Sequence, residues 1–520
     1  MALTAVAFVL RFFSPIMPDF FAHPFDGAPI SNCVRQTPVD AQGTLGTICG
    51  LAYPFQRGYA KSSGAPLEPP AGEVFDEVYF ADFPHDDLKG INYFDDKPTG
   101  GKLILAAGQL GWGWFRAAFQ GAHGDYRDLG FNTFGWRIMS CIIGTLVVPL
   151  MYLFALRLWP NRFFALAAGV LSCFDGMLFV QSRIAMLDII VVFFLVLTYW
   201  LFLLHLSSRT RRGSVATMLL CGTALGLGVA TKWSVLAALG TILLFIVMRP
   251  VLARLEILVR SGTGEWRLRR RDWRGLTIPG GVPVSAYAGL LVVALVAIPL
   301  FIYVTTWFPF FLRGQFHTLG DILAHDKAAY DFNAHLTATH PYGSPWFSWP
   351  FLYRPVAYYF QSQVMGTDQW TQRPLVAGMI DLGNPWIWWT SLPCLLAMPY
   401  FVLKHRSGAA TLITIAFLAQ YLPWSRISRV LFLYEMAAAL PFMILALALV
   451  LAKVAETRVD LHYGSGHTLT LPLRGLAYAH LVVAVLFFVY FYPVWTALPL
   501  GDSSYLGGFP GGKKWFPSWI

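Results

Sequence analysis

Charged residues are scarce in this chain. Asp, Glu, Lys and Arg make up 13% of its 520 residues, whereas hydrophobic residues make up 56%. Soluble domains carry about 25% charged residues, so this composition excludes an ordinary soluble protein. It indicates a protein that crosses a membrane several times.

Signals of other protein classes are missing too. The sequence has no internal repeat, no low-complexity tract and no CxxC or His-rich spacing typical of a metal site. The net charge of +10 is spread over short Lys and Arg clusters between apolar runs, which is the pattern of cytoplasmic loops. We therefore expect no metal, no cofactor and no nucleic-acid partner.

The chain has six cysteines. Cys33 and Cys49 lie in the same long polar segment. A disulfide between them is compatible with the sequence, but the sequence alone does not establish it. The other four lie in or beside apolar runs and are expected to be small packing residues: Cys141, Cys173, Cys221 and Cys394.

Long apolar runs predict about eleven membrane spans. They centre near residues 9, 145, 169, 194, 223, 242, 295, 393, 415, 441 and 487. The first run is short and is followed by Arg11. No convincing small-x-small cleavage site follows, so we expect a retained helix rather than a cleaved signal peptide.

Basic loops set the expected orientation. If the Arg-rich loops near 209–212 and 249–274 are cytoplasmic, the N-terminus lies inside and the C-terminus outside. Two long segments, 18–130 and 307–380, then face outward and are expected to contain short amphipathic helices on the membrane.

The predicted fold class is therefore an all-α polytopic membrane protein, organised as a single integral membrane domain over 1–520. Its last part, 381–520, is expected to hold four membrane helices and an outward tail.

Two adjacent carboxylates, Asp76 and Glu77, lie in the first outward segment between Phe75 and Tyr79. Adjacent side chains diverge in a helix or a strand, so they are poorly placed to flank one bond as a glycosidase pair does. We expect one to act on substrate while the other orients it or pairs with a cation. The alternative is a solvated acidic surface, which the flanking aromatic residues disfavour.

Several charges lie near the outward ends of predicted spans, against the positive-inside trend. A lipid phosphate at the headgroup level would gather such cations. Taken singly, each cation could equally be a snorkelling residue, and Asp188 could simply pair with Arg183 or another buried cation. The charges are Arg137, Asp175, Arg183, Asp188, Lys232, Arg426 and Arg429.

The segment from His340 to Pro350 is aromatic and stiffened by proline. It is either an interfacial belt element or a surface that stacks on a sugar ring or covers the site. In the second case His340 and Trp346 would contact substrate.

These motifs together resemble the bacterial-type protein O-mannosyltransferases that use polyprenyl-phosphate mannose, members of the C-type membrane glycosyltransferases (GT-C). The matching strings are Phe75-Asp76-Glu77, Gly135-Trp136-Arg137-Ile138, Gln181-Ser182-Arg183 through Asp188, Ala230-Thr231-Lys232-Trp233-Ser234, 340–350, Gly383-Asn384-Pro385, Trp388-Trp389, 421–424 with Arg429, and 515–519.

The resemblance implies an inverting transferase of eleven helices, with an N-in and C-out topology. Asp76 matches the catalytic carboxylate, with Glu77 beside it, and Arg137 matches an arginine thought to pair with that acidic site. Arg183, Lys232 and Arg429 are looser choices for contacts with the carrier phosphate, and Asp188 belongs to the same substrate-binding set.

The sequence departs from the family in two places. The usual His-Pro-Pro-Leu-Gly-Lys reads Lys-Pro-Thr-Gly-Gly-Lys at 97–102, and about 50 extra residues occupy roughly 19–70. The second outward segment is too short for the soluble domain that eukaryotic members insert there, so the bacterial subtype is the closer likeness.

The expected reaction moves mannose from a polyprenyl-phosphate carrier to Ser or Thr of secreted or membrane proteins. The site would face outward from the plasma membrane, in contact with membrane lipids, and family members can pair as dimers. Rival functions are transfer to a lipid or cell-envelope polymer, and transport of a lipid-linked sugar.

Overall fold

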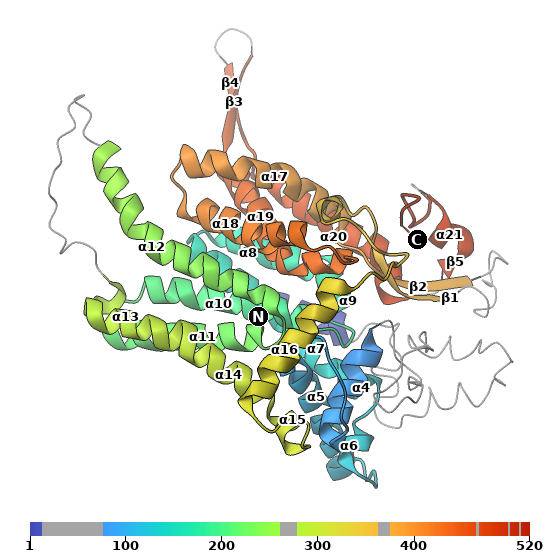
Figure 1. The fold of residues 1–520 in the computed structure, drawn as a ribbon. Helices are drawn as coiled ribbons and strands as arrows, with labels where there is room; N and C mark the ends of the chain where they lie inside the picture. Colours follow the sequence, from blue (N-terminus) through green and yellow to red (C-terminus); the bar gives the residue numbers. More distant parts are fainter. Residues whose placement is uncertain are drawn as a thin grey trace.

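A bundle of long helices forms most of the molecule (Figure 1). The computed structural model describes residues 1–12, 76–259, 278–361, 375–463, 467–497, 500–508 and 511–519.

Within these residues, six helical runs are long and apolar enough to cross a membrane. Each coincides with a predicted span, which confirms a polytopic membrane protein. The runs are α7 (Thr133–Leu158), α10 (Asp188–Leu206), α11 (Arg211–Val229), α17 (Pro385–Leu403), α20 (Arg474–Thr496), and the run 285–306, built from α13 (Val284–Val292), η4 (Val293–Ala297) and α14 (Ile298–Thr306).

The five other predicted centres fall in further helices. These are α1 (Ala2–Phe12), α8 (Arg162–Cys173), α12 (Leu236–Val259), α18 (Gly408–Tyr421) and α19 (Leu440–Glu456).

The run centred near 441 was placed too early. Pro441 lies in the first turn of α19, where its missing N–H costs nothing, so the α-helix begins there. The residues before it form a short 3₁₀ segment, η7 (Leu433–Ala438).

The described part of the segment 18–130, which was expected to face outward, contains α4 (Glu77–Lys89), α5 (Gly100–Phe119) and α6 (Tyr126–Leu129). With 20 residues, α5 is longer than the short surface helices expected there. Its buried Gln109 donates a hydrogen bond to the carbonyl of Ala81 at 2.9 Å, which ties α5 to α4. The start of α4 is thereby held against the bundle.

The segment 307–380, also expected to face outward, contains short helices, as predicted, and strands that the sequence did not predict. Its helices are α15 (Phe308–Leu312), α16 (Leu319–His335) and the 3₁₀ segment η5 (Trp346–Phe351). The strands β1 (Val356–Gln361) and β2 (Leu375–Asp381) pair antiparallel, and β5 (Leu500–Gly501) joins β2. The expectation of a purely helical fold was wrong here. The short strands β1, β2 and β5 lie together at one end of the bundle (Figure 1). A separate hairpin pairs β3 (Arg458–Tyr463) with β4 (His467–Pro472), and the short helix α21 (Asp502–Leu506) follows β5.

Four of the six cysteines lie within the described residues, where the helices pack closely. All four are free and buried, which confirms their expected packing role. Cys33 and Cys49 lie outside the described residues.

Candidate functional site

Asp76 stands at the N-terminus of α4, as its N-cap residue. Its side chain does not cap the helix, so the carboxylate is not committed to that structural role. The surrounding protein raises its pKa to about 6, with desolvation as the main cause. Lys97 opposes this shift, whereas Asp96 and Asp188 add to it. A carboxylate of this basicity is ionised at neutral pH yet binds a proton more readily than an ordinary Asp.

Glu77 points into the protein and is fully buried. Arg137 of α7 grips it with two donors: Nε lies 2.7 Å from Oε1 and Nη2 lies 2.5 Å from Oε2. The backbone N–H of Ala185 adds a third bond to Oε1 at 2.7 Å. Arg137, which was predicted to contact substrate, thus pairs with Glu77, as the resemblance also implied for the acidic site, and Glu77 anchors the start of α4.

A second group of charges forms an alternating chain of four residues, Asp188, Lys232, Glu435 and Arg429, which we call the charge quartet. Lys232 Nζ lies 2.9 Å from Asp188 Oδ1 and 3.2 Å from Glu435 Oε2. Arg429 Nη2 lies 3.1 Å from Glu435 Oε1. Asp188 was expected to pair either with Arg183 or with another buried cation. It pairs with another cation, Lys232.

The acids of the quartet lie beneath its cations. The side chains of Asp188 and Glu435 are 9% and 2% exposed, whereas those of Lys232 and Arg429 are 16% and 19% exposed. Burial alone would lower the pKa of Lys232, but the two carboxylates outweigh it and raise that pKa. An ammonium has three donors and a guanidinium five, so both cations keep donors beyond their bonds to the acids. Two partly exposed cations with donors to spare suit a phosphate.

The loop that follows Asp96, residues 97–102, adds Lys97 to the site, and Asp96 itself adds another acid. Lys97 Nζ lies 2.9 Å from Asp96 Oδ1, and Asn333 of α16 donates to Asp96 Oδ2 at 3.1 Å. These partners hold the pKa of Asp96 below its usual range against the opposing effect of burial. The charges that shift the pKa of Asp76 therefore include Lys97 and Asp96 of this loop and Asp188 and Lys232 of the quartet.

Glycine lets this loop touch the turn that precedes Lys232. The N–H of Gly100 donates to the carbonyl of Ala230 at 2.8 Å, and a Cβ at position 100 would lie 2.8 Å from the Ala230 Cβ. Gly101 is equally close to Thr231. Although this loop departs from the family's usual residues, it is fixed to the quartet through its backbone.

Arg183 lies elsewhere. It is fully buried, and its guanidinium carbon is 5.0 Å from the centre of the Phe179 ring. Its electrostatic neighbours include Arg11 and Arg137 rather than the quartet. Its proposed contact with the carrier phosphate finds no support in this placement. Arg426, at the end of η6 (Leu422–Arg426), is exposed.

The aromatic segment is split between two places. His340 packs edge-on against Phe432, which stacks on Tyr434 beside the quartet. Trp346 instead packs against Tyr421 of α18, and the Tyr421 hydroxyl donates to its carbonyl. His340 therefore lies near the charge quartet, whereas Trp346 packs against α18.

Sequence reasoning missed Glu435 and Asp96. An acidic residue inside the apolar run 427–452 is a functional signal in its own right, and it would have found Glu435. Asp96 gave no such signal, since it precedes a polar loop.

Sequence reasoning also missed a buried polar triad of Gln181, Tyr358 and Asp381. Gln181 Nε2 donates to Tyr358 Oη at 2.6 Å and to Asp381 Oδ2 at 3.0 Å, and Tyr358 Oη donates to the same oxygen at 3.0 Å. Burial raises the pKa of Asp381 to about 8, so this carboxyl is mainly neutral at pH 7. A register shift between Ala357 and Tyr359 in β1 places Tyr358 at an irregularity of the strand. The centre of the Tyr358 ring lies 6.5 Å from the centre of the Tyr434 ring, so the triad lies close to the quartet.

Two family profiles match the chain. The profile of dolichyl-phosphate-mannose-protein mannosyltransferases matches residues 67–312. The profile of the C-terminal four-helix membrane region of protein O-mannosyltransferases matches residues 318–519.

Curated relatives agree with the profiles. Polyprenol-phosphate-mannose–protein mannosyltransferase of Mycobacterium tuberculosis is 27% identical over 438 residues, which cover 75% of this chain and 77% of that protein. The Corynebacterium glutamicum protein of the same name is 25% identical over 444 residues, covering 75% and 78%.

A solved structure shares the fold. One chain of the Saccharomyces cerevisiae Pmt1–Pmt2 protein O-mannosyltransferase complex, bound to its sugar donor, superimposes with a TM-score of 0.63 at 14% identity, covering 86% of this chain and 89% of that one. From the two profiles and these relatives, the chain belongs to the protein O-mannosyltransferase family.

Proposed function

We propose that this protein transfers mannose from a polyprenyl-phosphate carrier to Ser or Thr hydroxyls of proteins. The observation that carries the proposal is Asp76, a carboxylate whose raised pKa is influenced by Asp188 and Lys232 of a quartet whose two cations are partly exposed. A proton acceptor next to a phosphate-binding surface is what transfer from a phosphate-linked sugar requires. The names of the curated relatives support the donor and the acceptor class.

In the proposed step, Asp76 takes the proton of the acceptor hydroxyl as its oxygen attacks the anomeric carbon. The bond from that carbon to the phosphate oxygen breaks, and its electron pair leaves with the lipid phosphate. Attack opposite the leaving group converts a β-linked donor into an α-linked product. The phosphate is already a good leaving group, so the step needs no acid to protonate it.

The quartet would stabilise the charge that grows on the phosphate. Lys232 and Arg429 are held in place by Asp188 and Glu435 before substrate arrives, so little reorganisation accompanies the reaction. Glu77 is assigned a positioning role through Arg137, and His340, which packs against Phe432, is assigned a contact with the sugar. The scheme routes no step through a metal.

The topology and location complete the proposal. Eleven spans with the N-terminus inside would place Asp76 and the quartet on the outer face of the plasma membrane, where secreted acceptors are available. The oligomeric state is proposed to include a dimer, as in other family members. Reaction with a thiol probe from outside the cell would label a cysteine placed at the exposed Lys327 of α16 but not one placed at Lys404.

The acceptor class separates this function from its rivals. Purified protein with radiolabelled polyprenyl-phosphate mannose should label a Ser/Thr-rich peptide and leave a lipid acceptor unlabelled. Label on the lipid alone would favour the lipid transferase. Movement of the donor across a vesicle membrane without any product would favour the transporter.

A further inference from the structure

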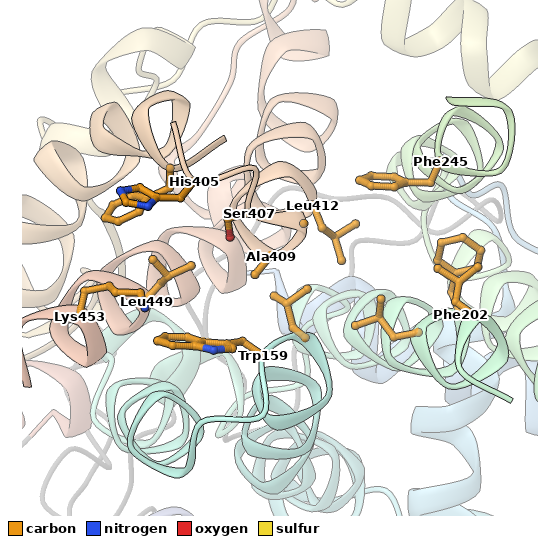
Figure 2. A pocket seen from close by; sticks show the side chains of 14 residues that line it. Trp159, Phe202, Phe245, His405, Ser407, Ala409, Leu412, Leu449 and Lys453 are labelled. Atoms are coloured by element: carbon orange, nitrogen blue, oxygen red, sulfur yellow. The ribbon is translucent and has the colours of Figure 1, made fainter. Parts of the chain in front are cut away.

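A large cleft lies far from the candidate site, between the ends of several helices (Figure 2). Its volume of about 670 Å³ is in the range of ligand pockets. Phe202 of α10 and Phe245 of α12 form one wall, and Leu412 of α18 and Leu449 of α19 face them (Figure 2). The walls are therefore apolar.

The helices themselves separate this cleft from the candidate site. Asp188 begins α10, and Leu206, at the other end of that helix, lines the cleft. Nineteen residues of α-helix span about 28 Å, close to the ~30 Å thickness of bilayer hydrocarbon. Likewise, Glu435 precedes α19, while Lys453 lies near its far end. The cleft and the candidate site thus lie at opposite ends of these helices, about one hydrocarbon thickness apart.

The rim of the cleft is polar and basic. His405, Ser407 and Lys453 lie on it (Figure 2). Lys453 Nζ lies 4.2 Å from the Trp159 ring centre and 3.0 Å from Glu456 Oε2, and its side chain is 46% exposed. An ammonium has three donors, so its single carboxylate partner leaves donors for a ligand. The N-terminus of α18 begins at the same rim and adds a partial positive charge.

We propose that this cleft binds an anionic glycerophospholipid from the leaflet opposite the candidate site. One acyl chain would lie between the α10–α12 wall and the α18–α19 wall, and the phosphate would meet Lys453 and the start of α18. The apolar walls would contact the acyl chain of the lipid, and the basic rim would pair with the negative charge of its headgroup. Neither wall offers the polar groups that a sugar or a peptide would need.

Native mass spectrometry of the full-length protein in detergent tests this proposal. Synthetic phosphatidylglycerol and phosphatidylcholine with identical acyl chains are added separately, and retained lipid is counted. The protein should retain one phosphatidylglycerol in preference to phosphatidylcholine. Lys453→Gln should lower that preference about fivefold. The matched control Lys404→Gln changes a basic residue of the same end that does not line the cleft, and should leave the preference unchanged.

A second variant blocks the space without changing charge. A Cβ at Gly408 meets no atom within 4 Å, so Gly408→Trp can place its ring in the cleft. It should abolish retention of phosphatidylglycerol. Gly475→Trp, at an equally open position near the start of α20, is its control. Equal retention of both lipids, or retention unaffected by Gly408→Trp and Lys453→Gln, would overturn the proposal. Displacement of the lipid by free glycerol phosphate would also overturn it, since the headgroup alone would then be the ligand.

Discussion

The guanidinium of Arg137 lies side-on against the carboxylate of Glu77, with donor–acceptor distances of 2.7 and 2.5 Å. This pair divides the two adjacent acids between two tasks. Glu77 is bound inside the protein by Arg137, whereas Asp76, one residue earlier, does not cap the helix, and the charges of the site influence its pKa.

Arg137→Ala should destabilise the protein strongly. It would leave Glu77 buried without its cation, and breaking a buried ion pair in this way costs about 3–5 kcal/mol. Thermal unfolding in detergent measures the effect. The double variant Arg137→Met with Glu77→Gln removes both charges and should regain part of the loss. A double variant no more stable than Arg137→Ala would contradict this account of the pair.

Asp76→Asn should abolish transfer, because an amide cannot accept the proton of the acceptor hydroxyl. Donor binding should remain within about twofold, since the quartet is untouched. Label transfer to peptide and retention of labelled donor are the two measurements. Asp331→Asn, at an exposed acid of α16, serves as the control and should keep full activity. Measurable turnover by purified Asp76→Asn would remove Asp76 from its role.

Lys232→Ala should raise the KM for the lipid donor by roughly 10- to 100-fold, as expected when a charge-assisted contact worth about 1.5–3 kcal/mol is lost. The KM for the acceptor peptide should change far less. Arg429→Ala should act in the same direction, whereas Arg426→Ala, three residues away and exposed, should not. Equal effects of Lys232→Ala on both substrates would argue against a phosphate contact.

The rate should fall in acid because Asp76 must be ionised to accept a proton. Its pKa of about 6 in the substrate-free protein predicts that kcat/KM falls tenfold per pH unit below about pH 6 and levels off above it. An unperturbed Asp would move that limb to about pH 4. A profile that stays flat down to pH 5 would show that the pKa of the base is not raised.

Asp381→Asn should be tolerated, because a carboxyl with a pKa of about 8 is mainly neutral at pH 7 and an amide has the same shape. Asp381→Leu leaves Gln181 and Tyr358 without their shared acceptor and should cost about 1–3 kcal/mol. Melting temperatures of the two variants give the comparison. Equal losses for Asn and Leu would mean that the hydrogen bonds of the triad contribute little.

The membrane spans were predictable because apolar runs of this length have few other uses. Each predicted centre falls inside a helix, and the error at α19 came from overlooking Pro441 as a start signal. The strands β1 and β2 were not predicted, since their pairing is set by tertiary contacts rather than by a long alternating pattern.

For the candidate site, the sequence singled out Lys232 and Arg429 because charges beside apolar runs are costly unless they are used. It singled out Asp76 as one of two adjacent acids between aromatic residues. It did not reveal that Arg183 would be buried against Phe179 while Glu435 joined the quartet. Residues 183 and 435 are both ionisable and both near spans. What distinguishes them is the direction in which each side chain leaves its helix end, which depends on the packing of neighbouring elements.

The bond from Gly100 to Ala230 has a consequence for how this enzyme could vary. It joins the segment that carries Lys97 to the turn that carries Lys232, so the positions of these two cations relative to each other are fixed. A side chain at position 100 would wedge the segments apart and shift the reacting groups without replacing any of them. Insertions between 96 and 100 should be poorly tolerated for the same reason.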